Sequence, residues 1–307
     1  MSAVVLLALA AIAADTWTSE EASGWVEPPA APPKLGAWST DLLDPDGLTR
    51  FHLTTRGLFS DGAQAISGSM AWSYEARAHI RLTKGIALSG VVPISHSIPE
   101  FERARIVFGN VGIGGVFGRQ LSTDPLAIRL GGSLDLYFPT SPKPEVGTIA
   151  RDTLVTAFRA YEPQLYVPRL FSARIRAHAD FTIEPLTLEG ELALIPGATI
   201  GPTAQFVMLF SAAGRVSARL GSVFEPYLEA ACAPQIAGAG EIAPPLLITP
   251  GLRLHIADSF DPAVFVSFNF VATSAVIFGV DLAAVVRPST SAQEASAKRR
   301  GFHETHF

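Results

Sequence analysis

The feature that most constrains the fold of this chain is a strict alternation of apolar and polar side chains over residues 71–83. The even-numbered residues are apolar or aromatic: Trp72, Tyr74, Ala76, Ala78, Ile80 and Leu82. The odd-numbered residues are polar or charged: Ser73, Glu75, Arg77, His79, Arg81 and Thr83. A period of two places successive side chains on opposite faces of a β-strand. The segment therefore predicts a strand with one apolar and one charged face, longer than the roughly 5–6 residues usual in globular sheets.

The same alternation returns along most of the chain. It is clearest at residues 171–182, which we expect to pair with residues 154–168 across a tight turn at Arg169. The predicted strands are 49–60, 71–83, 86–96, 105–119, 126–138, 154–168, 171–182, 186–194, 204–219, 224–233, 246–256, 263–272 and 275–286. A tilted strand needs roughly 9–11 residues to cross a bilayer, and most of these segments are long enough. Because such boundaries are uncertain, we predict about 12 strands, within a range of roughly 10–14.

These strands predict an all-β chain that forms an antiparallel transmembrane β-barrel over residues 48–287, with lipid outside and a polar lumen. A soluble all-β protein would also alternate, with the apolar face as its core. The long strands, the polar face rich in Arg and Glu, and aromatic residues near strand ends favour the membrane barrel. Residues 262–280 carry no charge and could form a transmembrane helix. Their alternation of Val264, Val266 and Phe268 with Ser267 and Asn269 instead favours two strands.

The regions outside the predicted barrel differ in composition. Residues 1–14 hold a continuous apolar run that ends in Ala11-Ile12-Ala13, which is typical of a cleaved signal peptide. Residues 15–47 show no periodicity and contain two Pro-Pro pairs, so we interpret them as an extended periplasmic linker. Residues 288–307 are charged and aperiodic, and we predict a disordered tail.

Charge and cysteine content exclude several classes of function. The net charge is −5 and no basic tract stands out, so no nucleic-acid partner is expected. Cys232 is the only cysteine, which rules out an intrachain disulfide and a Cys-based metal cluster. His303 and His306 are three residues apart in the tail, but a lone pair leaves most metal coordination positions unfilled. We therefore predict no metal site and no cofactor.

Two neighbouring segments resemble a known group of barrels. Residues 108–118 read FGNVGIGGVFG, and residues 128–140 read IRLGGSLDLYFPT. They resemble the Gly-rich strands of transporter-type outer-membrane β-barrels associated with the meta-pathway of phenol degradation. In this chain Asn110 stands where that group tends to have Asp, and Ser141 where it tends to have Gly. The resemblance implies an outer-membrane barrel that takes up small hydrophobic compounds, and it assigns no binding residue.

The strongest candidate site is the polar face of the strands, whose charged groups should point into the lumen. Its members are Glu75, Arg77, His79, Arg81, Arg129, Asp135, Arg174, Arg176, His178, Asp180, Glu189, Glu191, Arg253, His255 and Asp281. Because both signs occur, one interpretation is a salt-bridged network that fills a narrow barrel. The other is a lining that decides which solutes pass.

The predicted function is that of an outer-membrane channel or transporter in a Gram-negative cell, passing small molecules, including hydrophobic ones. The alternative is a non-conducting structural or surface barrel that acts through its extracellular loops. No spacing of Ser, His and acidic residues singles out a nucleophile with its base, so we do not expect an enzyme. The expected partners are outer-membrane lipid, an unidentified small solute and the barrel-assembly machinery.

Overall fold

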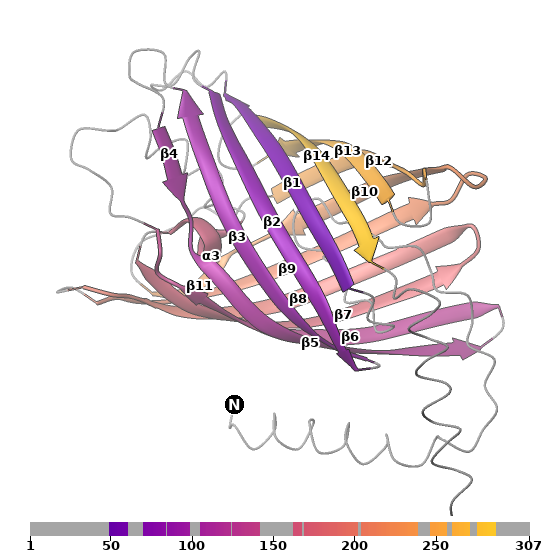
Figure 1. Ribbon diagram of the computed structural model, residues 1–307, viewed down its shortest axis with the longest axis horizontal. Helices are drawn as coiled ribbons and strands as arrows, with labels where there is room; N and C mark the ends of the chain where they lie inside the picture. Colours follow the sequence, from indigo (N-terminus) through magenta and orange to yellow (C-terminus); the bar gives the residue numbers. More distant parts are fainter. Residues whose placement is uncertain are drawn as a thin grey trace, which may run out of the picture. The chain divides into compact units, whose positions relative to one another are not determined.

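The computed structural model describes residues 49–60, 70–83, 85–98, 105–123, 125–141, 162–167, 169–201, 204–238, 246–256, 260–270 and 275–286. Long antiparallel strands wrap around a central space and dominate this part of the chain (Figure 1). The predicted signal peptide, linker and tail lie outside the described residues. So do residues 99–104 and 142–152 of the loops that we expected between strands.

The described strands follow one another along the chain in a single sheet. Their bounds are β1 (Thr49–Ser60), β2 (Met70–Thr83), β3 (Ile86–Ile98), β4 (Arg105–Phe108), β5 (Val111–Thr123), β6 (Leu126–Phe138), β7 (Leu170–Ile183), β8 (Leu186–Thr199), β9 (Phe206–Ala218), β10 (Phe224–Cys232), β11 (Gln235–Gly238), β12 (Leu246–Leu254), β13 (Phe260–Asn269) and β14 (Ala275–Val286).

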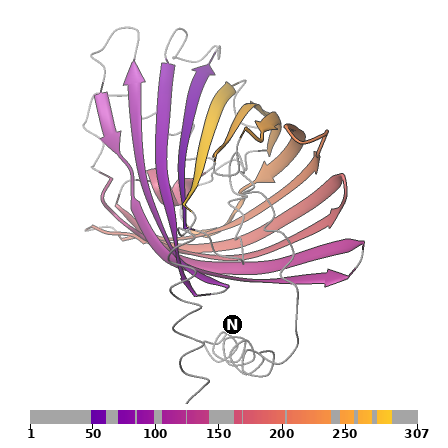
Figure 2. The same cartoon turned by 45° about the vertical axis from the view of Figure 1, so that its right-hand side comes forward.

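Antiparallel pairing closes this sheet into a barrel (Figure 2). Each long strand pairs with the next, β9 pairs with β10, and β14 returns to pair with β1 along its whole length. Two short strands extend longer ones: β4 and β5 both pair with β3, and β10 and β11 both pair with β9. Twelve of the described strands therefore form the wall. The predicted fold, an antiparallel transmembrane β-barrel of about 12 strands, is confirmed.

The prediction of a strand at residues 154–168 was wrong over the part that the structure describes, residues 162–167. Residues 163–166 form a short helix, α3 (Pro163–Tyr166), and residues 154–161 and 168 lie outside the described part. Strand β7 pairs with β6 on one side and with β8 on the other, so neither of its edges is open to a strand from this segment. Proline has no N–H to donate to a ladder but fits the first turn of a helix, which is where Pro163 lies.

The wall has an apolar outside and a polar inside. On β6, Leu130 and Leu134 are exposed, while Arg129, Ser133 and Asp135 on the opposite face of the strand are buried. A soluble β protein would bury such leucines, and here they are the residues that face outward, as a lipid-facing surface requires. Residues 262–269 lie in β13 and residues 275–280 lie in β14. Within the described residues, no helix has the length and apolar character needed to cross a membrane.

Glycines on the inner face make room for large side chains on the neighbouring strand. Tyr227 pairs with Gly251 and Phe265 pairs with Gly279, and in both cases an added Cβ on the glycine would overlap the aromatic ring. Tyr137 pairs with Gly112 in the same way, with 2.7 Å between its Cε1 atom and the position of an added Cβ. Such pairs let rings lie flat on the wall and keep the strands in register.

The pair of Tyr227 and Gly251 yields a prediction about stability. The Gly251→Ala substitution should lower the stability of the barrel by about 1–3 kcal/mol, because the methyl group forces the ring out of its place. The measurement is the temperature at which the folded band disappears in a heat-modifiability gel. The matched control is Gly190→Ala in β8, where an added Cβ meets no atom within 4 Å. Equal losses in both variants would contradict the packing argument.

Candidate functional site

The inner face of the barrel concentrates the charged side chains of the described residues. Of the candidates predicted from the sequence, His255 is partly exposed, and the side chain of Arg81 is outside those described. The others are buried: Glu75, Arg77, His79, Arg129, Asp135, Arg174, Arg176, His178, Asp180, Glu189, Glu191, Arg253 and Asp281. They do not converge on one point, because the structure distributes them over several clusters of ion pairs.

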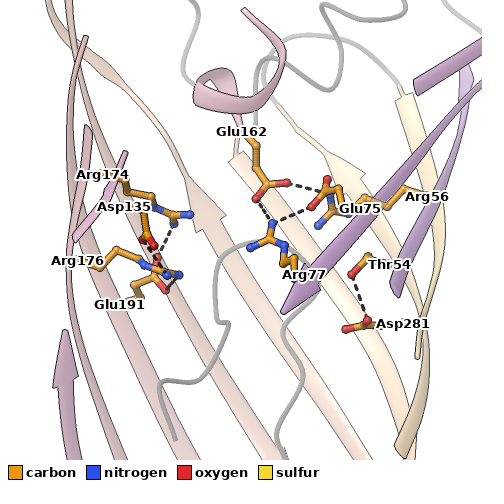
Figure 3. Close-up of polar contacts among 10 residues, drawn as sticks. All are labelled: Thr54, Arg56, Glu75, Arg77, Asp135, Glu162, Arg174, Arg176, Glu191 and Asp281. Atoms are coloured by element: carbon orange, nitrogen blue, oxygen red, sulfur yellow. Dashed lines mark hydrogen bonds and ion pairs between the residues drawn. The ribbon is translucent and has the colours of Figure 1, made fainter. Parts of the chain in front are cut away.

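The first cluster joins the barrel wall to the segment that contains α3, and we call it the Glu162 cluster (Figure 3). Arg56 of β1 and Arg77 of β2 both form ion pairs with Glu75 of β2. Both arginines also bind Glu162, one at each carboxylate oxygen: Arg56 Nη1 lies 2.9 Å from Oε2 and Arg77 Nη2 lies 2.8 Å from Oε1. All four side chains are almost completely buried. Glu162 is thus held from both sides of its carboxylate.

The segment that carries Glu162 is held by hydrogen bonds from Asn110, one of the two residues between β4 and β5, where the strand is interrupted. Asn110, in this break, donates its side-chain amide to the carbonyl oxygens of Gln164 (3.0 Å) and Val167 (2.8 Å). Its backbone N–H donates to Leu165 O at 2.6 Å. Gly109 must be a glycine here, because an added Cβ would lie 2.5 Å from Leu165 O. The break in the strand therefore serves as the docking point for residues 162–167.

The second cluster, which we call the Arg176 cluster, lies on β6, β7 and β8 (Figure 3). Arg176 of β7 lies 3.2 Å from Asp135 and 3.7 Å from Glu191, and Arg174 lies 2.6 Å from Glu191. Ser133 and Ser89 also donate to the Asp135 carboxylate, at 2.8 and 2.6 Å. The Asp135 carboxylate has donors on β3, β6 and β7, and the Glu191 carboxylate pairs with two arginines of β7, so these side chains are fixed against the wall.

A recess lies between the two clusters. Arg77 belongs to the Glu162 cluster and Arg176 to the Arg176 cluster, so the recess has an arginine at each side. Its floor is the wall of β3 and β5, whose side chains here are small and uncharged. The lining residues are Arg77, His79, Ser89, Gly90, Val91, Gly112, Asp135, Tyr137 and Arg176.

The other charged residues form separate pairs around the wall. Arg215 pairs with Glu189. Arg253 lies 2.9 Å from Glu225, and His255 lies 2.9 Å from Glu225 and 3.2 Å from Asp261. Asp180 lies 3.9 Å from both Arg129 and His178, and Thr54 donates to Asp281 at 3.1 Å.

Several buried charged residues of the inner face were not among the predicted site residues. Arg50, His52 and Arg56 alternate along β1, and Glu225 and Glu229 alternate along β10, so the same period of two could have identified them. Glu162 had no such signal, because its segment was interpreted as a strand. No group of three or more His, Cys, Asp or Glu side chains in the described part of the chain is arranged to hold a metal ion. His303 and His306 lie outside that part.

Comparisons by sequence identify no relative. No family model matches the chain, and no curated protein matches it.

Comparisons by structure show which fold the chain shares. An outer membrane channel from Pseudomonas putida F1 superposes with a TM-score of 0.59, at 11% sequence identity, over 85% of this chain and 100% of that one. The NanC porin (TM-score 0.47, 8% identity, 76% of this chain and 100% of that one) and the KdgM porin in complex with disordered oligogalacturonate (TM-score 0.44, 11% identity, 77% and 99%) match less well. At 11% identity the likeness to the Pseudomonas putida channel establishes the fold alone, that of an outer-membrane β-barrel.

Glu162, which belongs to no strand, has a raised pKa. Burial and the neighbouring Glu75 carboxylate raise the pKa of Glu162 from 4.5 to about 7, against the opposing effect of Arg77 and Arg56. A carboxyl with a raised pKa binds its proton more tightly when docked than when free in water. Docking of the segment is therefore favoured at low pH and weakens as the pH rises from 4.5 through 7.

This linkage predicts that residues 162–167 are more mobile at pH 8 than at pH 5. The measurement is the mobility of a spin label at Val167→Cys in a Cys232→Ser background, and the mobile fraction should increase several-fold over that range. In Glu162→Gln, which carries no titratable group at this position, the dependence on pH should disappear. Greater mobility at pH 5 than at pH 8 would show instead that the docked carboxyl has a lowered pKa.

Proposed function

We propose that this protein is a passive channel of the Gram-negative outer membrane for small solutes, narrowed by the segment that carries Glu162. The observation that carries the proposal is the uneven lining of the lumen. Strands β1, β2, β6, β7 and β8 direct charged side chains inward, whereas β3 and β5 contribute Ser89, Val91 and Gly112 to the recess. A solute would pass along this uncharged strip between Arg77 and Arg176.

The arrangement of charges supports selection of solutes by the lining. Arginines on both sides of a low-dielectric passage act on any ion that enters, because the field between them is poorly screened. Tyr137 and Val91 add an apolar surface to the same recess. This combination suits a small solute with an apolar body, as uptake in the phenol-degradation group would require. Membership of that group is part of the proposal, and so are export by residues 1–14 and insertion by the barrel-assembly machinery.

One observation favours the alternative of a non-conducting barrel. The largest fully buried side chains of the described part include Arg56, Arg215 and Arg253, so much of the lumen is filled by ion pairs. Conductance of the refolded protein in planar bilayers separates the two functions. Discrete steps from a heat-modifiable preparation support the channel, and a silent, correctly folded barrel supports the structural role.

The channel also predicts how arginine substitutions alter ion selectivity. Arg77→Ala and Arg176→Ala should each shift the reversal potential in a salt gradient toward cations, because each removes a positive charge from beside the path. The matched control is Arg219→Ala, which removes an exposed arginine just beyond the end of β9. A conducting protein whose selectivity is the same in all three variants would contradict the proposed path.

A further inference from the structure

We propose that residues 162–167 form a gate over the recess, that Glu162 is its latch, and that the gate is shut in acid and open in alkaline solution. This inference rests on the proposed function, because a gate matters only if solutes pass the recess. It deepens that function by giving the channel a control by pH.

The segment extends over the recess from one side to the other. Glu162 contacts Arg77 of β2 (Figure 3), and α3 packs against β7, so the segment contacts the strands at both sides of the recess. Strands β3, β5 and β6, which lie between β2 and β7 in the wall, supply the rest of the lining. Asn110 holds the segment just ahead of Gly112, which also lines the recess. A solute that enters from the end of the barrel where β6 leads to β7 therefore meets this segment first.

The segment has two attachments to the wall, and only one of them titrates near neutral pH. The Glu162 carboxyl accepts hydrogen bonds from Arg56 at 2.9 Å and from Arg77 at 2.8 Å. The second attachment consists of amide and carbonyl groups, in the hydrogen bonds of Asn110 with Gln164, Leu165 and Val167. Residues 162–167 read EPQLYV, so Glu162 is their only side chain that changes charge between about pH 4 and pH 9.

The arrangement around the latch explains why it holds better with a proton bound. Arg56 and Arg77 also bind Glu75, so two carboxyl groups share the same two arginines. Burial disfavours a charge on Glu162, and a second carboxylate nearby disfavours it further. The pKa of Glu162 is accordingly raised from 4.5 to about 7 by burial and by Glu75, against the effect of the arginines. On β7, which packs against α3, the first charged residue is Arg174, and it pairs with Glu191 at 2.6 Å.

The bound proton therefore favours the shut gate. A carboxyl whose pKa is about 7 when docked and 4.5 when free stabilises docking fully below pH 4.5, and this stabilisation is lost as the pH rises through 7. Between pH 5 and pH 8 the docking equilibrium should change by roughly 50- to 100-fold. When the latch opens, Arg56 and Arg77 keep their contacts with Glu75 on the paired strands, so the wall stays intact.

The test is single-channel recording of the refolded protein in planar bilayers from pH 5 to pH 8. The open probability should rise about tenfold or more over this range. Glu162→Gln keeps a neutral hydrogen-bonding group at the latch, so its open probability should stay at the low value of pH 5 throughout. Asn110→Ala removes the two amide bonds of the second attachment, so it should raise the open probability at pH 5 and keep the dependence on pH. The matched control, Glu184→Gln, removes an exposed carboxylate in the turn between β7 and β8 and should behave like the unmodified protein.

The outcomes separate the gate from the channel. A conducting protein whose open probability is independent of pH, or falls as the pH rises, would overturn the gate and leave the channel standing. Full dependence on pH in Glu162→Gln would do the same, because the titrating group would then lie elsewhere. A correctly folded barrel that is silent at every pH, in Asn110→Ala as well, would contradict the channel and the gate together.

Discussion

An arginine buried inside this barrel needs a carboxylate within reach, and the structure of the barrel depends on these ion pairs. In lipid the backbone must pair with itself, which a β-sheet achieves only by closing into a barrel, and the alternation of side chains then directs the polar residues inward. Removing one partner of a buried pair typically costs about 3–5 kcal/mol. The pairs of Arg215 with Glu189 and of Arg253 with Glu225 join neighbouring strands and therefore also constrain their register.

The choice of arginine over lysine follows from the same requirement. A guanidinium presents several donors in a fixed plane, so one side chain can serve two carboxylates at once. Arg176 lies between Asp135 and Glu191, and Arg77 lies between Glu75 and Glu162. An ammonium group could satisfy the charge but would not hold two partners in a defined orientation. The binding of Glu75 and Glu162 by both Arg56 and Arg77 is a direct consequence of this geometry.

The alternation of apolar and polar residues was sufficient to predict the strands of the barrel wall. It was not sufficient to predict the segment of residues 162–167 that docks inside the barrel. The period of two predicted the strands around Arg77 and Arg176, because successive side chains of a β-strand point to opposite faces. This alternation does not depend on which strand is the partner. Glu162 could not be found in this way. Its contact with Arg56 joins residues 106 positions apart, and nothing in the residues around it indicates that contact. Its segment was predicted to be a strand of the wall, but Leu165 is buried, and hydrophobicity alone does not distinguish a lipid-facing residue from one buried inside the barrel.

A filled interior and a path for solutes are compatible when one charged group is not fixed to the wall. Glu75, Asp135 and Glu191 belong to strands that pair on both sides, so they move only if the ladder itself opens. Glu162 is different, since its segment is attached by side-chain contacts and by the hydrogen bonds of Asn110. Displacing it breaks two ion pairs and leaves the wall intact. Any opening of the lumen beside Arg77 should therefore begin with the departure of this one carboxyl group.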